Sequence, residues 1–400
     1  MRIERLLAER FRNLENLRYE PHPRFNIFEG DNGQGKTNVL EALAILAGLR
    51  SFRTSRLGEC IRFGETQAAL GARVHGRGLR VDLGVEIQGA RSRVFVDGRA
   101  VSRSSEALGT LTAVIFCAAD LALPHGEPAA RRRWLDRAIF LHRPAYLAEV
   151  RRFETALSSR NVLLRQADAP GFDARTLDAY DEVLAVAAGQ IRARRHAFVA
   201  EFAPRLQAEF SAFAAEGHLA GLRYEPHEVQ SAQTSGDGHA AVSQTQELSA
   251  AQWATRLAAD LHTRRRLDVR RGTTSVGPHR DDVSVLLDGR PAREHASAGQ
   301  SRALVIALKI AEIRSLETTL GEPPVLLLDD LSSELDAERN AAMMRHLDAL
   351  GGQVFLTTTD ARHIHLRTAH RVCTVRAGQL VAAVDVLGDG ADVVVEAAGV

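Results

Sequence analysis

The first quarter of the chain has a pattern of hydrophobic and polar positions that predicts several strands and one helix. Residues 25–29 and 111–117 are apolar runs of the kind found in buried strands. The stretch from Asn38 to Gly48 has helical periodicity. Four further stretches have a strand-like pattern: residues 1–9, 68–75, 79–87 and 93–97. This region is therefore expected to be rich in β-structure with one early helix.

From Glu127 to Glu216 the strand pattern disappears and helical periodicity replaces it. Alanine, leucine, arginine and glutamate dominate, and we expect breaks at Pro170-Gly171 and at Pro204. Residues 228–250 contain neither arginine nor an aromatic residue. This middle region predicts a helical bundle or arm, with a mobile surface loop near 228–250.

The last third returns to alternating strands and helices. Strands are predicted at 283–287, 325–328 and 354–357, and helices at 300–319 and 334–350. Because α/β structure lies at both ends with helices between them, we expect one composite domain that an inserted arm interrupts. Its parts would be an N-terminal lobe at 1–126, a mainly helical arm at 127–270 and a C-terminal lobe at 271–400.

Charge and cysteine content narrow the function classes. The chain has 51 basic and 50 acidic residues and a net charge of +1, so any nucleic-acid surface must be local rather than uniform. Only Lys36 and Lys309 are lysines, and every other basic residue is arginine. The three cysteines lack the spacing of a disulfide framework or a metal site. Without a membrane-length apolar run or a recognisable signal peptide, we expect a cytoplasmic protein that uses no membrane.

One segment has the spacing of a phosphate-binding loop, G-x-x-x-x-G-K-T. Its candidate nucleotide ligands are Gly30, Asp31, Asn32, Gly33, Gln34, Gly35, Lys36 and Thr37. Glycines let the backbone turn its N–H groups towards phosphate oxygens, and the following helix adds the positive end of its dipole. Lys36 would reach the β- and γ-phosphates of ATP, and the Thr37 hydroxyl would bind Mg²⁺. A P-loop is therefore expected here.

Two later segments supply the remaining chemistry of such a site. Asp329 and Asp330 follow the apolar run 325–328, at the strand end where parallel α/β sheets bind ligands. Asp329 would complete the Mg²⁺ site, and Asp330 would polarise the attacking water. Ser297, Gly299 and Gln300 open a predicted helix and would form a second anion site there, although by themselves they are also an ordinary helix cap.

In this order the motifs resemble ABC-type ATPase heads of the SMC kind, and among these the RecF family. The resemblance covers residues 1 to about 360 and rests on seven blocks: Phe11–Asn13, Gly30–Asn38, Ser51–Arg53, Arg131–Asp136, Gly277–Asp282, Ser297–Arg302 and Leu326–Asp336. It implies an α/β P-loop ATPase head with an inserted helical arm, and it adds Asn38 to the nucleotide site.

The resemblance also implies a function. Two chains would dimerise head to head around ATP, with Ser297, Gly299 and Gln300 of one chain covering the γ-phosphate that Lys36 of the other holds. It further implies DNA binding at single-strand gaps and junctions, and partnership with RecR and RecO in loading RecA. Asp330 stands where many such heads have glutamate, so slow ATP turnover is expected.

The arginine clusters do not by themselves identify the DNA-binding surface. They lie at 131–133, 192–195, 264–266 and 270–271. Such clusters would bind phosphates, but solvated helix faces in an arginine-rich chain produce them too. Two other functions remain as alternatives: a P-loop phosphotransferase acting on a small substrate, and the ATPase subunit of a membrane transporter.

Overall fold

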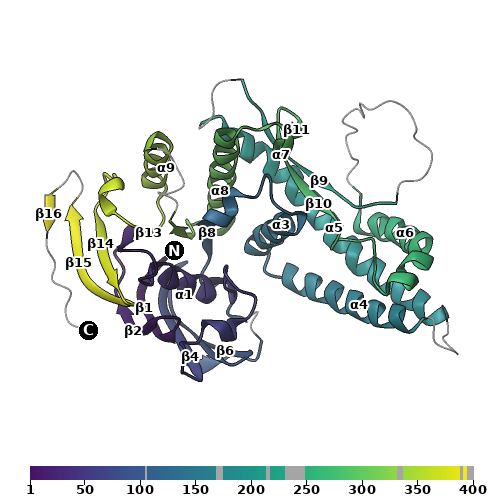
Figure 1. Ribbon diagram of the computed structural model, residues 1–400, viewed down its shortest axis with the longest axis horizontal. Helices are drawn as coiled ribbons and strands as arrows, with labels where there is room; N and C mark the ends of the chain where they lie inside the picture. Colours follow the sequence, from purple (N-terminus) through teal and green to yellow (C-terminus); the bar gives the residue numbers. More distant parts are fainter. Residues whose placement is uncertain are drawn as a thin grey trace. The chain divides into compact units, whose positions relative to one another are not determined.

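The computed structural model describes residues 1–103, 106–167, 174–212, 217–229, 248–330, 337–387 and 391–393. The chain divides into two compact units. Unit 1 combines Met1–Ala122 with Arg302–Val400, and unit 2 is the continuous segment Leu123–Ser301. The two ends of the chain thus belong to one unit and the middle forms the other (Figure 1).

The unit boundaries differ from the expected ones. The first lies between residues 122 and 123, close to the expected position after 126, but the second lies between 301 and 302 rather than at 270. The reason is strand β10 (Asp282–Leu287), which pairs antiparallel with β9 (Ala220–Glu225) and so belongs to unit 2. The sequence pattern had not indicated β9.

The described residues of unit 1 form two sheets. The first has six strands in the order β2-β1-β4-β5-β6-β7: β2 (Leu14–Tyr19), β1 (Arg2–Phe11), β4 (Gln67–Gly76), β5 (Leu79–Gln88), β6 (Arg91–Val96) and β7 (Arg99–Ala100). The second has seven strands in the order β16-β15-β14-β3-β13-β12-β8: β16 (Ala391–Val393), β15 (Gln379–Leu387), β14 (His370–Arg376), β3 (Phe25–Glu29), β13 (Val354–Thr358), β12 (Val325–Asp329) and β8 (Ala113–Cys117). The strands from β14 to β8 are parallel. The predicted P-loop follows β3, and Asp329 ends β12.

Helix α1 (Lys36–Gly48) packs against strands of both sheets, including β1 and β4 of the first and β12 and β13 of the second. Every residue from Val39 to Ala47 is buried, and all of them except Glu41 are apolar. The other helical elements of this unit are α2 (Ala118–Leu121), most of α8 (Ala298–Leu320), α9 (Ala337–Ala349) and the 3₁₀ turns Leu57–Cys60 and Ala361–His363. A core between two sheets therefore fixes the helix that follows the P-loop.

Unit 2 is mainly helical. Its elements are α3 (Pro128–His142), α4 (Tyr146–Gln166), α5 (Ala174–Phe210), β9, α6 (Ala250–Arg271), β10, β11 (Arg290–Pro291) and α7 (Ala292–His295). Helix α5 packs against both α4 and α6 (Figure 1), and β11-β10-β9 form a small sheet.

One expectation for the middle region had a different outcome. The expected break at Pro204 is wrong, since α5 continues through it. Proline in a helix interior costs about 3 kcal/mol, but Phe202, Leu206 and Phe210 are buried at four-residue spacing on either side and hold the helix in place. The loop predicted near 228–250 and the break at Pro170-Gly171 lie largely or wholly outside the described residues. No helix among those described is long and apolar enough to cross a bilayer.

Candidate nucleotide-binding site

The predicted P-loop connects the C-terminal end of β3 with the N-terminus of α1. Gly30, Gly33 and Gly35 have φ angles of 145°, 81° and 112°, which side chains strongly disfavour. A Cβ atom on Gly30 would lie 2.5 Å from the Val375 carbonyl oxygen, and one on Gly35 would lie 2.5 Å from Oδ1 of Asn13. Conformation therefore favours glycine at all three positions, and close contacts add to this at Gly30 and Gly35.

Lys36 lies inside this loop. Its side chain is almost buried, and Nζ donates hydrogen bonds to the backbone carbonyls of Gly30 (2.6 Å) and Asp31 (2.9 Å). No side chain caps the N-terminus of α1, whose N-cap residue is Gly35. Among the described residues, the first amides of α1 and the Lys36 ammonium thus form a positive site of the kind that binds phosphate.

The Mg²⁺ ligands expected from the sequence lie next to one another. Thr37 Oγ1 donates to Asp329 Oδ1 at 2.8 Å, which joins the start of α1 to the end of β12. Thr357, on the intervening strand β13, also donates to Asp329 (2.9 Å) and accepts from the backbone N–H of Asp330 (2.9 Å). A hydroxyl and a carboxylate are ligands that Mg²⁺ prefers. The role of Thr357 was missed, although its place at a strand end beside the P-loop strand would have indicated it.

The predicted second anion site has the geometry of a helix cap. Ser297 Oγ accepts from the Gln300 backbone N–H (3.2 Å), and Gln300 Oε1 accepts from the Ser297 N–H (2.9 Å), so the two residues form a capping box. Gln300 also contacts His218 (Nε2–Nε2, 3.3 Å), whose Nδ1 lies 2.8 Å from Asp288. These residues all belong to unit 2. Residues Ser332–Asp336 of the last motif lie outside those the structure describes.

Comparisons with known proteins identify the family. A family model described as the RecF/RecN/SMC N terminal domain matches residues 2–380. The DNA replication and repair protein RecF of Myxococcus xanthus is 44% identical over 360 residues, which cover 90% of this chain and 91% of that protein. The chain belongs to the RecF family. The RecF of Geobacter sulfurreducens is 36% identical over 366 residues, covering 92% of this chain and 95% of the relative.

Solved structures confirm the ATPase-head fold expected from the motifs. A structure of the recombination mediator protein RecF with ATP has a TM-score of 0.82 at 26% identity, covering 96% of this chain and 97% of that one. A second RecF structure, with ATPγS, has a TM-score of 0.84 at 27% identity and covers 95% and 97% of the two chains. An Smc head bound to the C-terminal winged-helix domain of ScpA has a TM-score of 0.52 at 13% identity, covers 97% of this chain and 98% of that one, and shows a likeness of fold alone.

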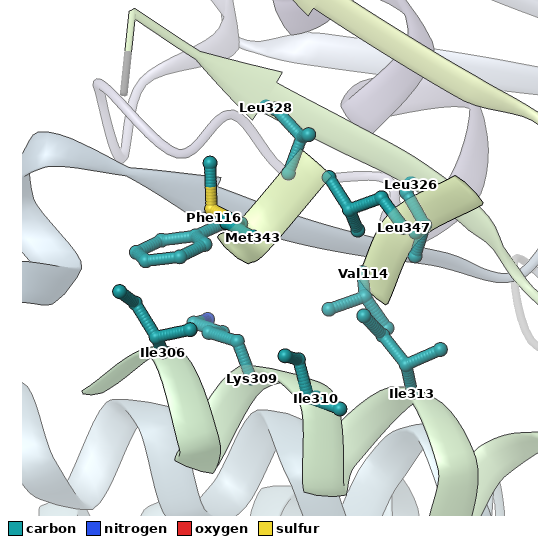
Figure 2. A pocket seen from close by; sticks show the side chains of 10 residues that line it. All are labelled: Val114, Phe116, Ile306, Lys309, Ile310, Ile313, Leu326, Leu328, Met343 and Leu347. Carbon is teal, nitrogen blue, oxygen red and sulfur yellow. The ribbon is translucent and has the colours of Figure 1, made fainter. Parts of the chain in front are cut away.

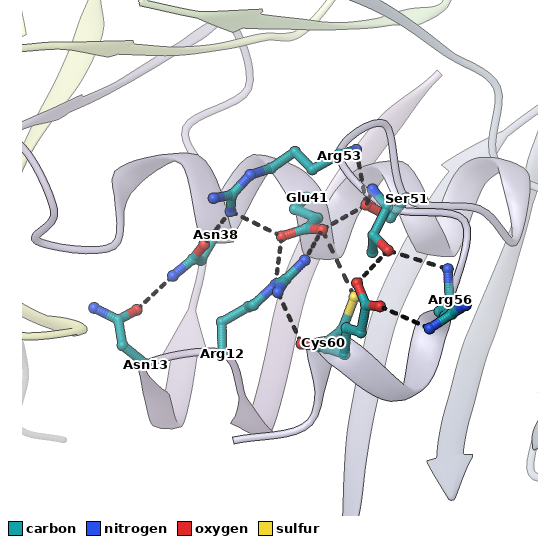
Figure 3. Close-up of polar contacts among 10 residues, drawn as sticks. Arg12, Asn13, Asn38, Glu41, Ser51, Arg53, Arg56 and Cys60 are labelled. Carbon is teal, nitrogen blue, oxygen red and sulfur yellow. Dashed lines mark hydrogen bonds and ion pairs between the residues drawn. The ribbon is translucent and has the colours of Figure 1, made fainter. Parts of the chain in front are cut away.

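Two of the blocks that indicated the RecF family meet beside the P-loop. Glu41 of α1 is fully buried and accepts hydrogen bonds from Arg12 (3.0 and 2.8 Å), Arg53 (3.2 Å) and Ser51 (2.5 Å) (Figure 3). Burial opposes ionisation of this carboxylate, but the Arg12 and Ser51 hydrogen bonds and both arginine charges keep its pKa below the ordinary value. Burial raises the pKa of the neighbouring Cys60 thiol to about 11, so that thiol stays protonated.

A chain of amide contacts connects this cluster to the loop. Arg53 donates to Asn38 Oδ1 (2.8 Å), Asn38 donates to Asn13 Oδ1 (2.7 Å), and Asn13 donates to the Gln34 carbonyl (3.0 Å). That carbonyl also accepts from the Gly378 N–H (2.8 Å), in the turn between β14 and β15. The cluster and the turn therefore hold the P-loop from different elements of unit 1.

Lys309, the other lysine, is a buried structural residue of α8. Its ammonium donates to the Ile115 carbonyl (2.7 Å) and lies 3.2 Å from Asp120 and 3.6 Å from Glu312. The side chain lines an apolar cavity of about 10 Å³ between α8, β8, β12 and α9 (Figure 2), which has room for one water at most. An arginine at this position would have to place a larger, planar guanidinium in the space that the compact ammonium occupies.

The two remaining family-like blocks in unit 2 form buried ion pairs. Arg131 of α3 bonds to Asp282 (2.9 and 2.7 Å), and Asp136 of the same helix bonds to Arg195 (2.9 Å). Arg192 of α5 bonds to Asp281 (3.0 and 2.9 Å). All three arginines are buried. For them, both interpretations offered by the sequence, a DNA-binding surface and a solvated helix face, are wrong.

Proposed function

We propose that this protein is an ATP-dependent DNA-binding clamp of DNA replication and recombinational repair in the cytoplasm. The observation that carries the proposal is the junction of Lys36, Thr37 and Asp329, which brings the P-loop and the end of β12 to one point. The similarity of the chain to relatives called DNA replication and repair protein RecF supports the proposed role in DNA repair. Its similarity to RecF structures with ATP supports ATP as the nucleotide.

The nucleotide site would work through residues already in place. The backbone of Gly30–Asn38 and the Lys36 ammonium would bind the phosphates of ATP, and Thr37 with Asp329 would hold Mg²⁺, which neutralises phosphate charge when bound. Asp330, held by the Thr357 contact to its N–H, would orient the attacking water. Its carboxylate is shorter than that of glutamate, so we expect slow hydrolysis.

Binding of ATP would favour a homodimer, because the second chain adds contacts that only the nucleotide-bound form makes. Ser297, Gly299 and Gln300 of one chain would cover the γ-phosphate held by the other. The dimer would engage DNA at single-strand gaps and junctions, and act with RecR and RecO in loading RecA. Hydrolysis would then reopen it.

The test compares dimerisation and DNA retention with ATP, ADP and no nucleotide. Lys36→Arg is expected to abolish the ATP-dependent dimer, because the guanidinium is too large for a loop whose carbonyls lie 2.6 and 2.9 Å from the ammonium. Asp330→Asn is expected to keep nucleotide binding and to prolong retention on gapped DNA. A Lys36→Arg protein that dimerises and retains DNA like the wild type would contradict the proposal.

A further inference from the structure

The C-terminal part of α6 has an excess of positive charge at its surface. Residues 262–271 read HTRRRLDVRR, and their one carboxylate, Asp268, is fully buried against Arg160 at 2.9 Å. Arg266, Arg270 and Arg271 are exposed, and no carboxylate among the described residues lies within ion-pair distance of them. The exposed charge at this end of the helix is therefore entirely positive.

A fourth arginine comes from the neighbouring helix. Arg165, in the last turn of α4, is exposed. A Cβ atom on Gly272, the residue that ends α6, would lie only 2.8 Å from Arg165 Cγ. The C-terminal ends of α4 and α6 therefore meet within unit 2 (Figure 1). Arg165 lies at this meeting point, where α6 ends.

Three arginines elsewhere in unit 2 behave differently. Arg205, Arg223 and Arg293 have a glutamate partner at 3.3, 2.8 and 2.9 Å. A cation at the end of a helix also compensates the helix dipole, by roughly 0.3–1 kcal/mol. That role is served by a single charge per helix end and would not require three exposed arginines on α6.

The spacing suits a regular polyanion. Arg266 and Arg270 are four residues apart on one face, which separates them by about 6 Å along the helix axis. The phosphates of one DNA strand follow each other at roughly 3.4 Å along the duplex axis, so guanidiniums at this spacing can each take a phosphate without reading a base.

We propose that the end of α6, with Arg165, binds the phosphate backbone of duplex DNA. The inference rests on the proposed function and adds the surface to it: a site that recognises phosphates and not sequence. It also agrees with a net charge of +1, because the DNA surface is then one local patch.

The experiment measures how salt weakens binding of the full-length protein, with ATP, to a labelled duplex of about 30 base pairs. The logarithm of the binding constant falls as the logarithm of the salt concentration rises. Replacing Arg266, Arg270 and Arg271 with glutamine is expected to make this slope less steep, by about 0.9 for each lost phosphate contact. Between about 50 and 200 mM salt, the wild type should then weaken roughly 40-fold more than this variant. The loss should be the same for duplexes of different sequence.

A matched control replaces Arg205, Arg223 and Arg293 with glutamine, which removes as many arginines, all partly exposed and paired with glutamate, from the same unit. This control is expected to keep the wild-type slope, and ATP binding should be equal in all three proteins. If the α6 variant keeps the wild-type slope, or if both variants lose it equally, the inference is wrong. Wild-type protein that binds no DNA would instead contradict the proposed function.

Discussion

The two units bury charge in different ways. In unit 1, the fully buried carboxylate Glu41 lies beside the P-loop, and Lys309 lies where α8 packs on the second sheet. In unit 2, buried arginines join separate segments of the chain. Arg131 and Arg192 bond to Asp282 and Asp281 at the start of β10, and Arg195 of α5 bonds to Asp136 of α3. Arg160 of α4 bonds both Asp181 of α5 and Asp268 of α6.

This difference shows what buried arginine contributes to unit 2. A guanidinium can donate two parallel hydrogen bonds to one carboxylate, which fixes the orientation of both partners. Unit 2 uses this to position helices, while unit 1 relies on apolar sheets and a helix buried between them. Buried ion pairs add little net stability, yet removing one partner is costly because the other charge stays behind.

The largest effect is expected when a buried pair of unit 2 is broken. Arg192→Met would leave Asp281, which also accepts from Tyr224 and from the His227 N–H, without its cation. We expect a loss of about 3–5 kcal/mol in the free energy of unfolding. The only two tryptophans, Trp134 and Trp253, are both buried in unit 2, so their fluorescence follows its unfolding. A loss below about 1 kcal/mol would show that the pair does not position the helix.

These pairs mark the limit of what the sequence could predict. The P-loop and the Asp329 strand follow from local spacing, because one short segment contains the whole motif, and the structure brings Thr37 and Asp329 together. The partner of Arg192 lies 89 residues away, and no periodicity links the two. A cluster of arginines in the sequence therefore shows only that arginine is abundant there. Which of these arginines are buried and which are exposed depends on the fold.

The second expected effect is a pH dependence of unit 2. His279 donates from Nε2 to the Thr274 carbonyl (3.0 Å), while its buried Nδ1 has no hydrogen-bond partner among the described residues. Burial, with the nearby Arg280 and Arg132 charges, lowers its pKa from 6.5 to about 4, although the Thr274 bond and Asp281 oppose this. The unfolded chain thus binds the proton more readily, so stability is present above pH 6.5 and falls as pH drops towards 4, by about 3 kcal/mol.

The check compares urea unfolding of the wild type and His279→Gln across this pH range by tryptophan fluorescence. The difference between the two proteins cancels the titration of shared carboxylates. It should shrink as the pH falls from 6.5 to 4, and a constant difference would mean that His279 does not titrate in this window.

A smaller effect is expected at Lys309, where the chain departs from its use of arginine. Lys309→Arg would force a larger group into the space beside Ile115 and Asp120, at a cost of about 1–3 kcal/mol. Hydrogen exchange of the α8 amides in unit 1 measures this loss. Exchange as slow as in the wild type would show that arginine fits, and that the size of the site does not explain the lysine at this position.

The smallest effect should come from an exposed pair in the same unit as Arg192. Arg223 of β9 lies 2.8 Å from Glu225, and both side chains are partly exposed to solvent. Because water already solvates both charges, Arg223→Gln should change the free energy of unfolding by less than about 1 kcal/mol. The ratio between this loss and that of Arg192→Met, measured with the same fluorescence signal, isolates burial as the variable. Equal losses at the two sites would mean that residue type, and not location, sets the stability of the arginine pairs.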